Sequence, residues 1–208
     1  MSLRERKKER TRQAIADAAI AMFLRDGFDD VSTADVAAAV EISKPTLFRY
    51  FPTKEDLVVH RFDDHIGEAA RVVRGRAEGE TPLAALHRTF RAGLERRDPV
   101  TGLCDHPQVL AFHRLVFETP SLASRVTDLG AADVDALTAA LREAVPSDVG
   151  LRPRLLATQV VAVQQALART NAAALVAGTT ADELYPRTVT DVDDAFALLG
   201  GGAAGLGY

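Results

Sequence analysis

Apolar residues recur at helical spacing along nearly the whole chain, and no stretch shows the strict alternation typical of a half-buried strand. Between residues 11 and 25, for example, Ile15, Ala18, Ala19, Met22 and Phe23 fall on one face of a helix. Similar stripes predict longer helices over residues 54–77, 82–98, 107–118, 122–145, 151–177 and 181–199. Pro186 is expected to delay or bend the last of them. The pattern therefore predicts an all-α protein.

Two much shorter helices are predicted at residues 33–40 and 44–51. Ser32 stands three residues ahead of Asp35, the spacing of a capping box that opens the first of them. Ser43 can cap the second, and Pro45 is tolerated in its first turn because the N–H it lacks would be unpaired there. A short turn of about three residues separates the two helices.

Two short helices joined by such a turn are typical of a helix-turn-helix, whose second helix lies in the major groove of DNA. The second helix presents residues suited to that groove: the charges of Lys44 and Arg49, the hydroxyl and methyl of Thr46, and the phenol of Tyr50. Lys54 follows, where a phosphate could lie. The spacing alone leaves open a second interpretation, a helical hairpin with a solvated charged face.

Composition places few further limits on function. The chain has 208 residues, 47% hydrophobic and 26% charged, as in ordinary globular proteins. Cys104 is its only cysteine, so no disulfide framework is expected, and no spacing of metal ligands is recognised. Gly200, Gly202 and Gly205 match G-x-G-x-x-G, but no strand precedes them, so no dinucleotide site is expected. No apolar run is long enough to span a bilayer, and the N-terminus lacks the apolar segment of a signal peptide. We therefore expect a cytoplasmic protein without cofactor or metal.

The formal net charge of −4, taken by itself, argues against a nucleic-acid partner. The charge is unevenly distributed, however. Residues 1–61 hold 11 basic and 10 acidic side chains, whereas residues 62–208 hold 14 and 19. The first twelve residues alone carry six basic and two acidic side chains. Local positive charge on the N-terminal segment is thus compatible with DNA binding.

The stretch SKPTLFRYFPTKEDL, from Ser43 to Leu57, resembles the signature of the TetR family of transcriptional regulators. Residues 14–37 upstream fit the same family in register, and residues 114–122 resemble one subgroup of its ligand-binding domains. Carried over position by position, the resemblance implies DNA contacts from Thr33, Lys44, Pro45, Thr46, Arg49, Tyr50 and Lys54. Pro45 would contact a thymine methyl.

Three positions depart from the family pattern. Glu41 stands in the turn where the family often has glycine, and a left-handed conformation there would cost about 1 kcal/mol. Phe48 replaces the commoner tyrosine and lacks a hydroxyl that could bind a phosphate. Ala34 is shorter than the polar residue that often reaches a base. These departures bear on individual contacts rather than on the fold.

The resemblance also implies a helix-turn-helix DNA-binding domain in residues 1–53 and a larger ligand-binding and dimerisation domain in residues 54–208. Its last two helices would form a dimeric four-helix bundle, and their apolar stripes agree with this. The predicted interface residues are Leu156, Val160, Val163, Leu167, Val189, Val192, Phe196 and Leu199. Ordinary core packing is the alternative interpretation of these stripes. Candidates for lining a ligand pocket are His65, His87, Phe90, Phe112, His113, Phe117, Gln164 and Asn171.

We therefore expect a non-enzymatic transcriptional regulator, a repressor that binds a palindromic DNA operator as a homodimer and is released by a small-molecule effector. The alternative is a helical small-molecule-binding protein or enzyme whose helix-turn-helix is vestigial or mediates protein contacts. Lys44, Arg49 and Lys54 on one face favour the first.

Overall fold

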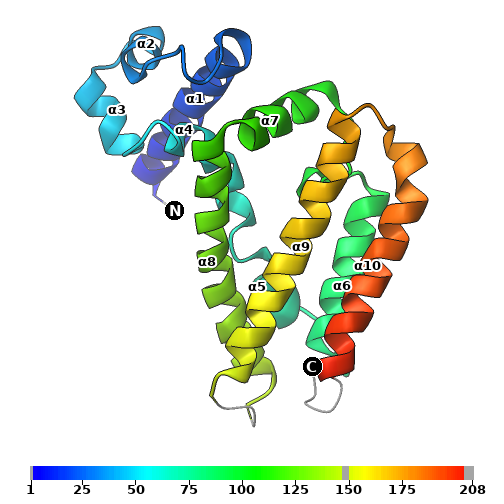
Figure 1. Ribbon diagram of the computed structural model, residues 1–208. Coiled ribbons are helices and arrows are strands. Elements are labelled where there is room, and N and C mark those ends of the chain that lie inside the picture. Colours follow the sequence, from blue (N-terminus) through cyan, green and yellow to red (C-terminus); the bar gives the residue numbers. More distant parts are fainter. Residues whose placement is uncertain (1, 147–149, 204–208) are drawn as a thin grey trace. The chain divides into compact units, whose positions relative to one another are not determined.

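A computed structural model describes residues 2–146 and 150–203, and every regular element in these ranges is a helix (Figure 1). The elements, in chain order, are α1 (Leu3–Asp26), α2 (Thr33–Ala39), α3 (Lys44–Tyr50), α4 (Asp56–Val59), η1 (His60–His65), α5 (Glu68–Arg74), α6 (Pro82–Glu95), η2 (Pro99–Thr101), α7 (Pro107–Glu118), α8 (Pro120–Ala144), α9 (Arg152–Val176) and α10 (Ala181–Ala203). The predicted all-α fold is confirmed. No helix among the described residues has the length and apolar character needed to cross a membrane.

The chain divides into two compact units. The first contains the residues up to Asp63 together with Ala111–Val126. Its core joins the buried faces of α1, α2, α3 and α4 to residues of α7 and α8, through side chains such as Phe23, Leu47 and Phe51. The predicted DNA-binding helices thus belong to a unit with its own core. The predicted boundary at residue 53 stays a prediction.

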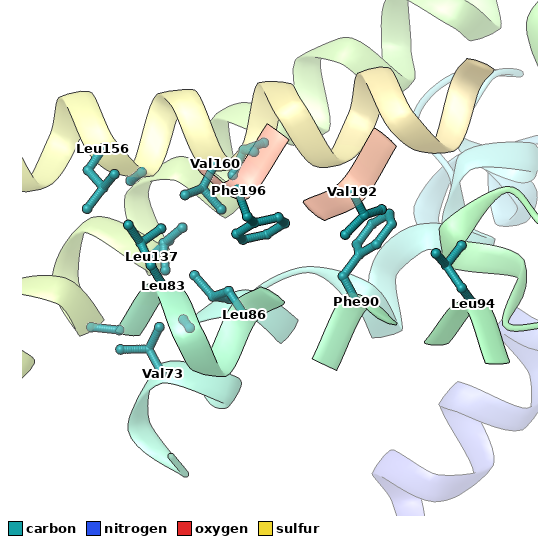
Figure 2. Packing of buried hydrophobic residues seen from close by; sticks show 14 of the residues in the cluster. Val73, Leu83, Leu86, Phe90, Leu94, Leu137, Leu156, Val160, Val192 and Phe196 are labelled. Carbon is teal, nitrogen blue, oxygen red and sulfur yellow. The ribbon is translucent and has the colours of Figure 1, made fainter. Parts of the chain in front are cut away.

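The second unit contains Asp64–Leu110 and the residues from Thr127 onward. Within it, α10 packs against both α6 and α9. Figure 2 shows the side chains that fill this core, with Phe90 of α6 beside Val192 of α10, and Phe196 among the same cluster. Helix α9 adds Leu156 and Val160, which are 7% and 0% exposed. This unit is held together mainly by the mutual packing of its long helices.

The single helix predicted over residues 54–77 is wrong. The structure has instead α4, η1 and α5, with a break at Gly67, whose φ is +75°. Within the second unit, the Gly67 N–H donates to Asp133 Oδ1 at 2.6 Å, and Arg71 donates to the carbonyl oxygens of Ile66 and Asp64. Side chains thus satisfy backbone groups that a continuous helix would have paired, and the break is stable.

The ends of two other helices also differ from expectation. Helix α1 begins at Leu3, because Ser2 and Glu5 form a capping box that the apolar stripe does not reveal. Helix α10 begins at Ala181, directly after the predicted capping box of Thr180 and Glu183, and continues through Pro186. The predicted late start is therefore wrong.

Candidate nucleic-acid interface

The turn between α2 and α3 adopts the left-handed conformation considered for Glu41, whose φ is 55°. The Glu41 N–H donates to the Ala38 carbonyl oxygen at 3.1 Å, and the Ile42 N–H donates to that of Ala37 at 2.9 Å. These two bonds form a Schellman motif, which closes a helix and usually has glycine at the left-handed position. The helix-turn-helix thus keeps its turn geometry although glycine is absent.

Helix α3 is fixed at both ends. At its start, Ser43 Oγ accepts from the Thr46 N–H at 3.2 Å and lies 2.8 Å from Thr46 Oγ1. Pro45 occupies the first turn, as predicted. Leu47, which is 1% exposed, and Phe51, the C-cap residue, point into the core of the first unit. Because these two side chains are buried, the opposite face of α3 must be turned to solvent.

That opposite face consists of Lys44, Pro45, Phe48 and Arg49, all exposed, and we call it the α3 face. Residues four apart on a helix are neighbours, so Lys44 lies near Phe48, and Pro45 near Arg49. The Lys44 Nζ is 5.8 Å from the centroid of the Phe48 ring. The α3 face thus has two positive charges, from Lys44 and Arg49, and the apolar side chains of Pro45 and Phe48 lie between them.

The remaining predicted DNA contacts are less exposed. Thr46 and Tyr50 are half-buried beside the α3 face. Thr33 is half-buried at the first position of α2, next to the Ser32–Asp35 capping box. Hydrogen bonds from the Ser32 side chain and backbone hold the pKa of Asp35 below its usual range. The Asp35 carboxylate is therefore charged when it accepts these two bonds of the capping box. The structure brings Lys44, Pro45, Thr46, Arg49 and Tyr50 together on one helix.

Lys54 is placed differently from the α3 face. Its ammonium donates to the Phe28 carbonyl oxygen and lies 4.3 Å from the centroid of the Phe28 ring. It is also 5.5 Å from the centroid of Phe23. The ammonium has three N–H donors, so a phosphate contact remains a prediction. Its evident role is to bind the end of α1 and the following loop to the segment after α3.

A polar cluster that the sequence pattern does not indicate lies against the C-cap of α3. The Arg12 guanidinium is 5.3 Å from the Phe51 ring centroid, and its Nη2 is 3.2 Å from Asp63 Oδ2. The Asp63 carboxylate also lies 2.8 Å from Nδ1 of the buried His60, whose ring meets Phe51 edge-on at 5.5 Å. The cluster thus links α1 to the end of α3. Arg12 is far from the other three residues in the sequence, beyond the reach of helical spacing.

The predicted ligand-binding residues are divided between the two units. Phe112, His113 and Phe117 belong to the first, whereas the other five, His65, His87, Phe90, Gln164 and Asn171, belong to the second. An open depression of about 390 Å³ in the second unit is lined by a different set, Glu68, Arg71, Val72, Gly75, Arg88 and Thr89.

Several of these candidates already have partners within the chain. The Asn171 amide donates to the Thr101 carbonyl oxygen at 2.9 Å, and Phe90 is part of the second core. His87 Nε2 lies 2.7 Å from Asp193 Oδ1, and Arg91 bonds the same carboxylate. The structure thus gives Asn171, Phe90 and His87 a packing or bridging role, and a ligand contact by any of the eight candidates stays a prediction.

The predicted dimer residues also separate into two groups. Four of them, Leu156, Val160, Val192 and Phe196, are buried in the core of the second unit, as Figure 2 shows. The other four, Val163, Leu167, Val189 and Leu199, are half-buried. The large apolar side chains exposed in this part of the chain are leucines. Leu151, in the turn before α9, is 62% exposed, Leu155 on α9 is 51% exposed, and Leu198 on α10 is 82% exposed. An interface formed by α9 and α10 would cover these exposed leucines as well as the half-buried residues.

Comparison with known proteins gives a consistent result. Residues 15–60 match the family model described as bacterial regulatory proteins, tetR family. The HTH-type transcriptional regulator TcmR of Streptomyces glaucescens is 33% identical over 173 residues, which cover 80% of this chain and 75% of that protein.

Solved structures show the same fold. A TetR-family regulator from Streptomyces coelicolor A3 has a TM-score of 0.57 at 22% identity, covering 91% of this chain and 96% of that one. NalD, the secondary repressor of the MexAB-OprM multidrug efflux pump in Pseudomonas aeruginosa, has a TM-score of 0.57 at 17% identity, covering 90% and 97%.

The matched segment spans the second half of α1 and all of α2 and α3, which contain the capped turn and the α3 face. The relatives are transcriptional regulators rather than enzymes, so the prediction of a non-enzymatic DNA-binding protein is confirmed on that ground. The chain belongs to the TetR family of bacterial transcriptional regulators.

Proposed function

We propose that this regulator is a repressor that binds a palindromic operator as a homodimer and is released by a small-molecule effector. The observation that carries the DNA-binding part is the α3 face, where Lys44 and Arg49 flank an apolar centre on a helix whose other side is buried. The proposed DNA contacts are Thr33, Lys44, Pro45, Thr46, Arg49 and Tyr50. The repressor role is supported by the similarity to NalD, which is described as a repressor. Its site of action would be the cytoplasm, where the DNA lies.

The palindrome follows from the proposed dimer. A two-fold symmetric protein presents two copies of α3, so its half-sites should lie one or more helical turns apart on the DNA. The dimer is supported by exposed Leu155 and Leu198, since large apolar side chains on long helices are commonly covered by a second subunit.

Effector release requires two conformations with different affinity for the operator. A ligand shifts such an equilibrium only by its differential affinity for the two states. We propose that the effector binds the second unit. The half-buried polar side chains of His87 and Gln164 are the first to test there, by a thermal-shift screen of small molecules against wild type and the two alanine variants.

The DNA-binding proposal is tested by gel shift against the DNA flanking the gene, with a salt titration. The expected result is binding to a palindrome with an affinity that falls steeply as salt rises, because phosphate contacts release counterions. Arg49→Ala should weaken specific binding by about 1–3 kcal/mol if the guanidinium reads a guanine. Arg25→Ala is the matched control, since Arg25 is also an exposed arginine near a helix end but pairs with Asp26. Equal binding by both variants would contradict the assignment of Arg49.

The dimer is tested separately by light scattering. The wild-type protein should have the mass of a dimer at micromolar concentration, and Leu198→Glu should shift it toward the monomer. Leu24→Glu, which adds the same charge at an exposed leucine of α1, is the control and should leave the mass unchanged. A monomeric mass for the wild type would overturn the dimer.

A further inference from the structure

Phe48 is the one aromatic side chain of α1–α3 and the segments joining them that is left exposed. It is 39% exposed, whereas Phe23, Phe28 and Phe51 in the same unit are exposed by 7% or less. Tyr50, the other aromatic residue of α3, is half-buried. Fully burying a phenylalanine is favourable by about 1.5–3 kcal/mol. An exposed ring at the centre of a binding surface is therefore expected to be covered by the molecule that binds there.

The neighbours of Phe48 restrict what that partner is. The ring lies between Lys44, whose Nζ is 5.8 Å from its centroid, and exposed Arg49, with exposed Pro45 three residues before it. Residues three or four apart share a helix face, so Pro45 and Phe48 give the α3 face an apolar strip bordered by two cations. An apolar strip with cationic borders complements a surface that has anionic rims and an apolar centre.

The major groove of DNA has this arrangement, with phosphates along both rims. Among the base edges in the groove, the C5-methyl group of thymine is the apolar one. A phenyl ring has no hydroxyl to donate to a phosphate, so Phe48 can gain free energy in the groove by covering a methyl group, not by hydrogen bonding.

We propose that Phe48 is a specificity-determining residue that recognises a thymine methyl in each half-site of the operator. This inference rests on the proposed function, because it requires that the α3 face enters the major groove. Pro45 covers a second, different thymine, so each half-site contains two positions at which the methyl group contributes to affinity.

Deoxyuridine substitution tests the proposal, because uracil differs from thymine only by the missing methyl. Each thymine of an operator identified by gel shift is replaced singly, and the dissociation constant is measured for wild type and for Phe48→Ala. At one position the substitution should weaken wild-type binding about three- to fivefold, which is the loss expected when one methyl group that the protein covers is removed. Phe48→Ala should bind the two DNAs equally at that position and keep its sensitivity at the Pro45 position.

Leu24→Ala is the matched control, because it truncates another exposed apolar residue of the first unit away from α3 and should keep the wild-type sensitivity at every position. Phe48→Leu, which retains an apolar side chain, should keep part of the sensitivity to deoxyuridine at the Phe48 position. A wild-type protein indifferent to every deoxyuridine, or a Phe48→Ala variant with the wild-type pattern, would overturn the inference while leaving salt-dependent operator binding intact. Absence of any specific binding by the wild type would instead overturn the proposed function and this inference with it.

Discussion

The ammonium of Lys54 donates to the carbonyl oxygen of Phe28 and lies 4.3 Å from the centroid of the same residue's ring. One side chain thus satisfies a backbone acceptor and covers an aromatic face 26 residues earlier in the chain. Replacing Lys54 by methionine keeps most of the apolar stem but removes both interactions. A hydrogen bond from a charged group contributes about 1.5–3 kcal/mol and a cation–π interaction about 0.5–1 kcal/mol. We expect Lys54→Met to lower the free energy of unfolding by about 2 kcal/mol, measured by urea denaturation.

DNA binding separates this structural role of Lys54 from the predicted phosphate contact. The slope of log K against log salt becomes shallower by about 0.9 for each phosphate that the protein no longer neutralises. We expect Lys44→Met, on the exposed α3 face, to change the slope by about that amount. An equal change in Lys54→Met would confirm the predicted phosphate contact of Lys54, whereas a wild-type slope would leave Lys54 with its structural role alone.

Glu41 is expected to be a site of stored backbone strain. Its φ of 55° is easily adopted by glycine but costs about 1 kcal/mol for a residue with a Cβ. Glu41→Gly should therefore raise the free energy of unfolding by at most about 0.6 kcal/mol, because the greater entropy of the unfolded glycine, about 0.4–1 kcal/mol, offsets much of the relieved strain. Glu41→Ala, which removes the charge but keeps the Cβ, is the control. If the alanine variant gained as much stability as the glycine variant, strain would not be the cause.

Gly102 is expected to tolerate no side chain at all. A Cβ at this position would lie 1.9 Å from the carbonyl oxygen of Ala168 in α9, and the φ of +74° is itself unfavourable for other residues. Because the obstacle is backbone, it cannot move aside as a flexible side chain would. Gly102→Ala should lower the free energy of unfolding by more than about 3 kcal/mol or prevent folding. Gly79→Ala is the control, since its φ of +78° is similar but no atom lies within 4 Å of the added Cβ.

Helices α2 and α3 could be predicted from the sequence because the signals that determine them are local. The caps at Ser32 and Ser43 and the buried position of Leu47 each depend on residues a few positions apart. The break at Gly67 could not be predicted in this way, because the Asp133 carboxylate that stabilises it is 66 residues away. The same holds for the contact between Lys54 and Phe28.

The long helices show a second limit of sequence patterns. An apolar stripe indicates that a face is buried but not by which chain. The stripes of α9 and α10 predict Val160 and Phe196 at a dimer interface, whereas both lie in the core of their own protomer. The same stripes give no indication of Leu198, which lies off them on the exposed side of α10. The places of Lys44, Pro45 and Arg49 on the α3 face, by contrast, follow from the sequence, because burial of one side of so short a helix determines which side is exposed. The exposure of Phe48 and the half-burial of Thr46 and Tyr50 were not predicted.

His113 should make the stability of the protein depend on pH. Its side chain is buried in the first unit, its Nδ1 has no hydrogen-bond partner among the described residues, and burial lowers the pKa of the imidazole from its ordinary value of about 6.5. Above that value both the folded and the unfolded chain hold a neutral ring, and His113 adds no pH dependence. As the pH falls below about 6.5, the unfolded chain binds a proton that the folded chain does not, so stability falls by at most about 1.4 kcal/mol per pH unit until the folded pKa is reached.

His113→Leu keeps an apolar side chain of similar size and cannot bind a proton. We expect its free energy of unfolding, measured by urea denaturation from about pH 7.5 down to about pH 5, to fall less steeply on acidification than that of the wild type. His106→Gln is the control, because His106 is exposed and its replacement should leave the wild-type profile unchanged. The opposite result would be a leucine variant that loses stability as steeply as the wild type. It would mean that other groups cause the acid sensitivity and that the His113 imidazole binds a proton equally in the folded and unfolded states.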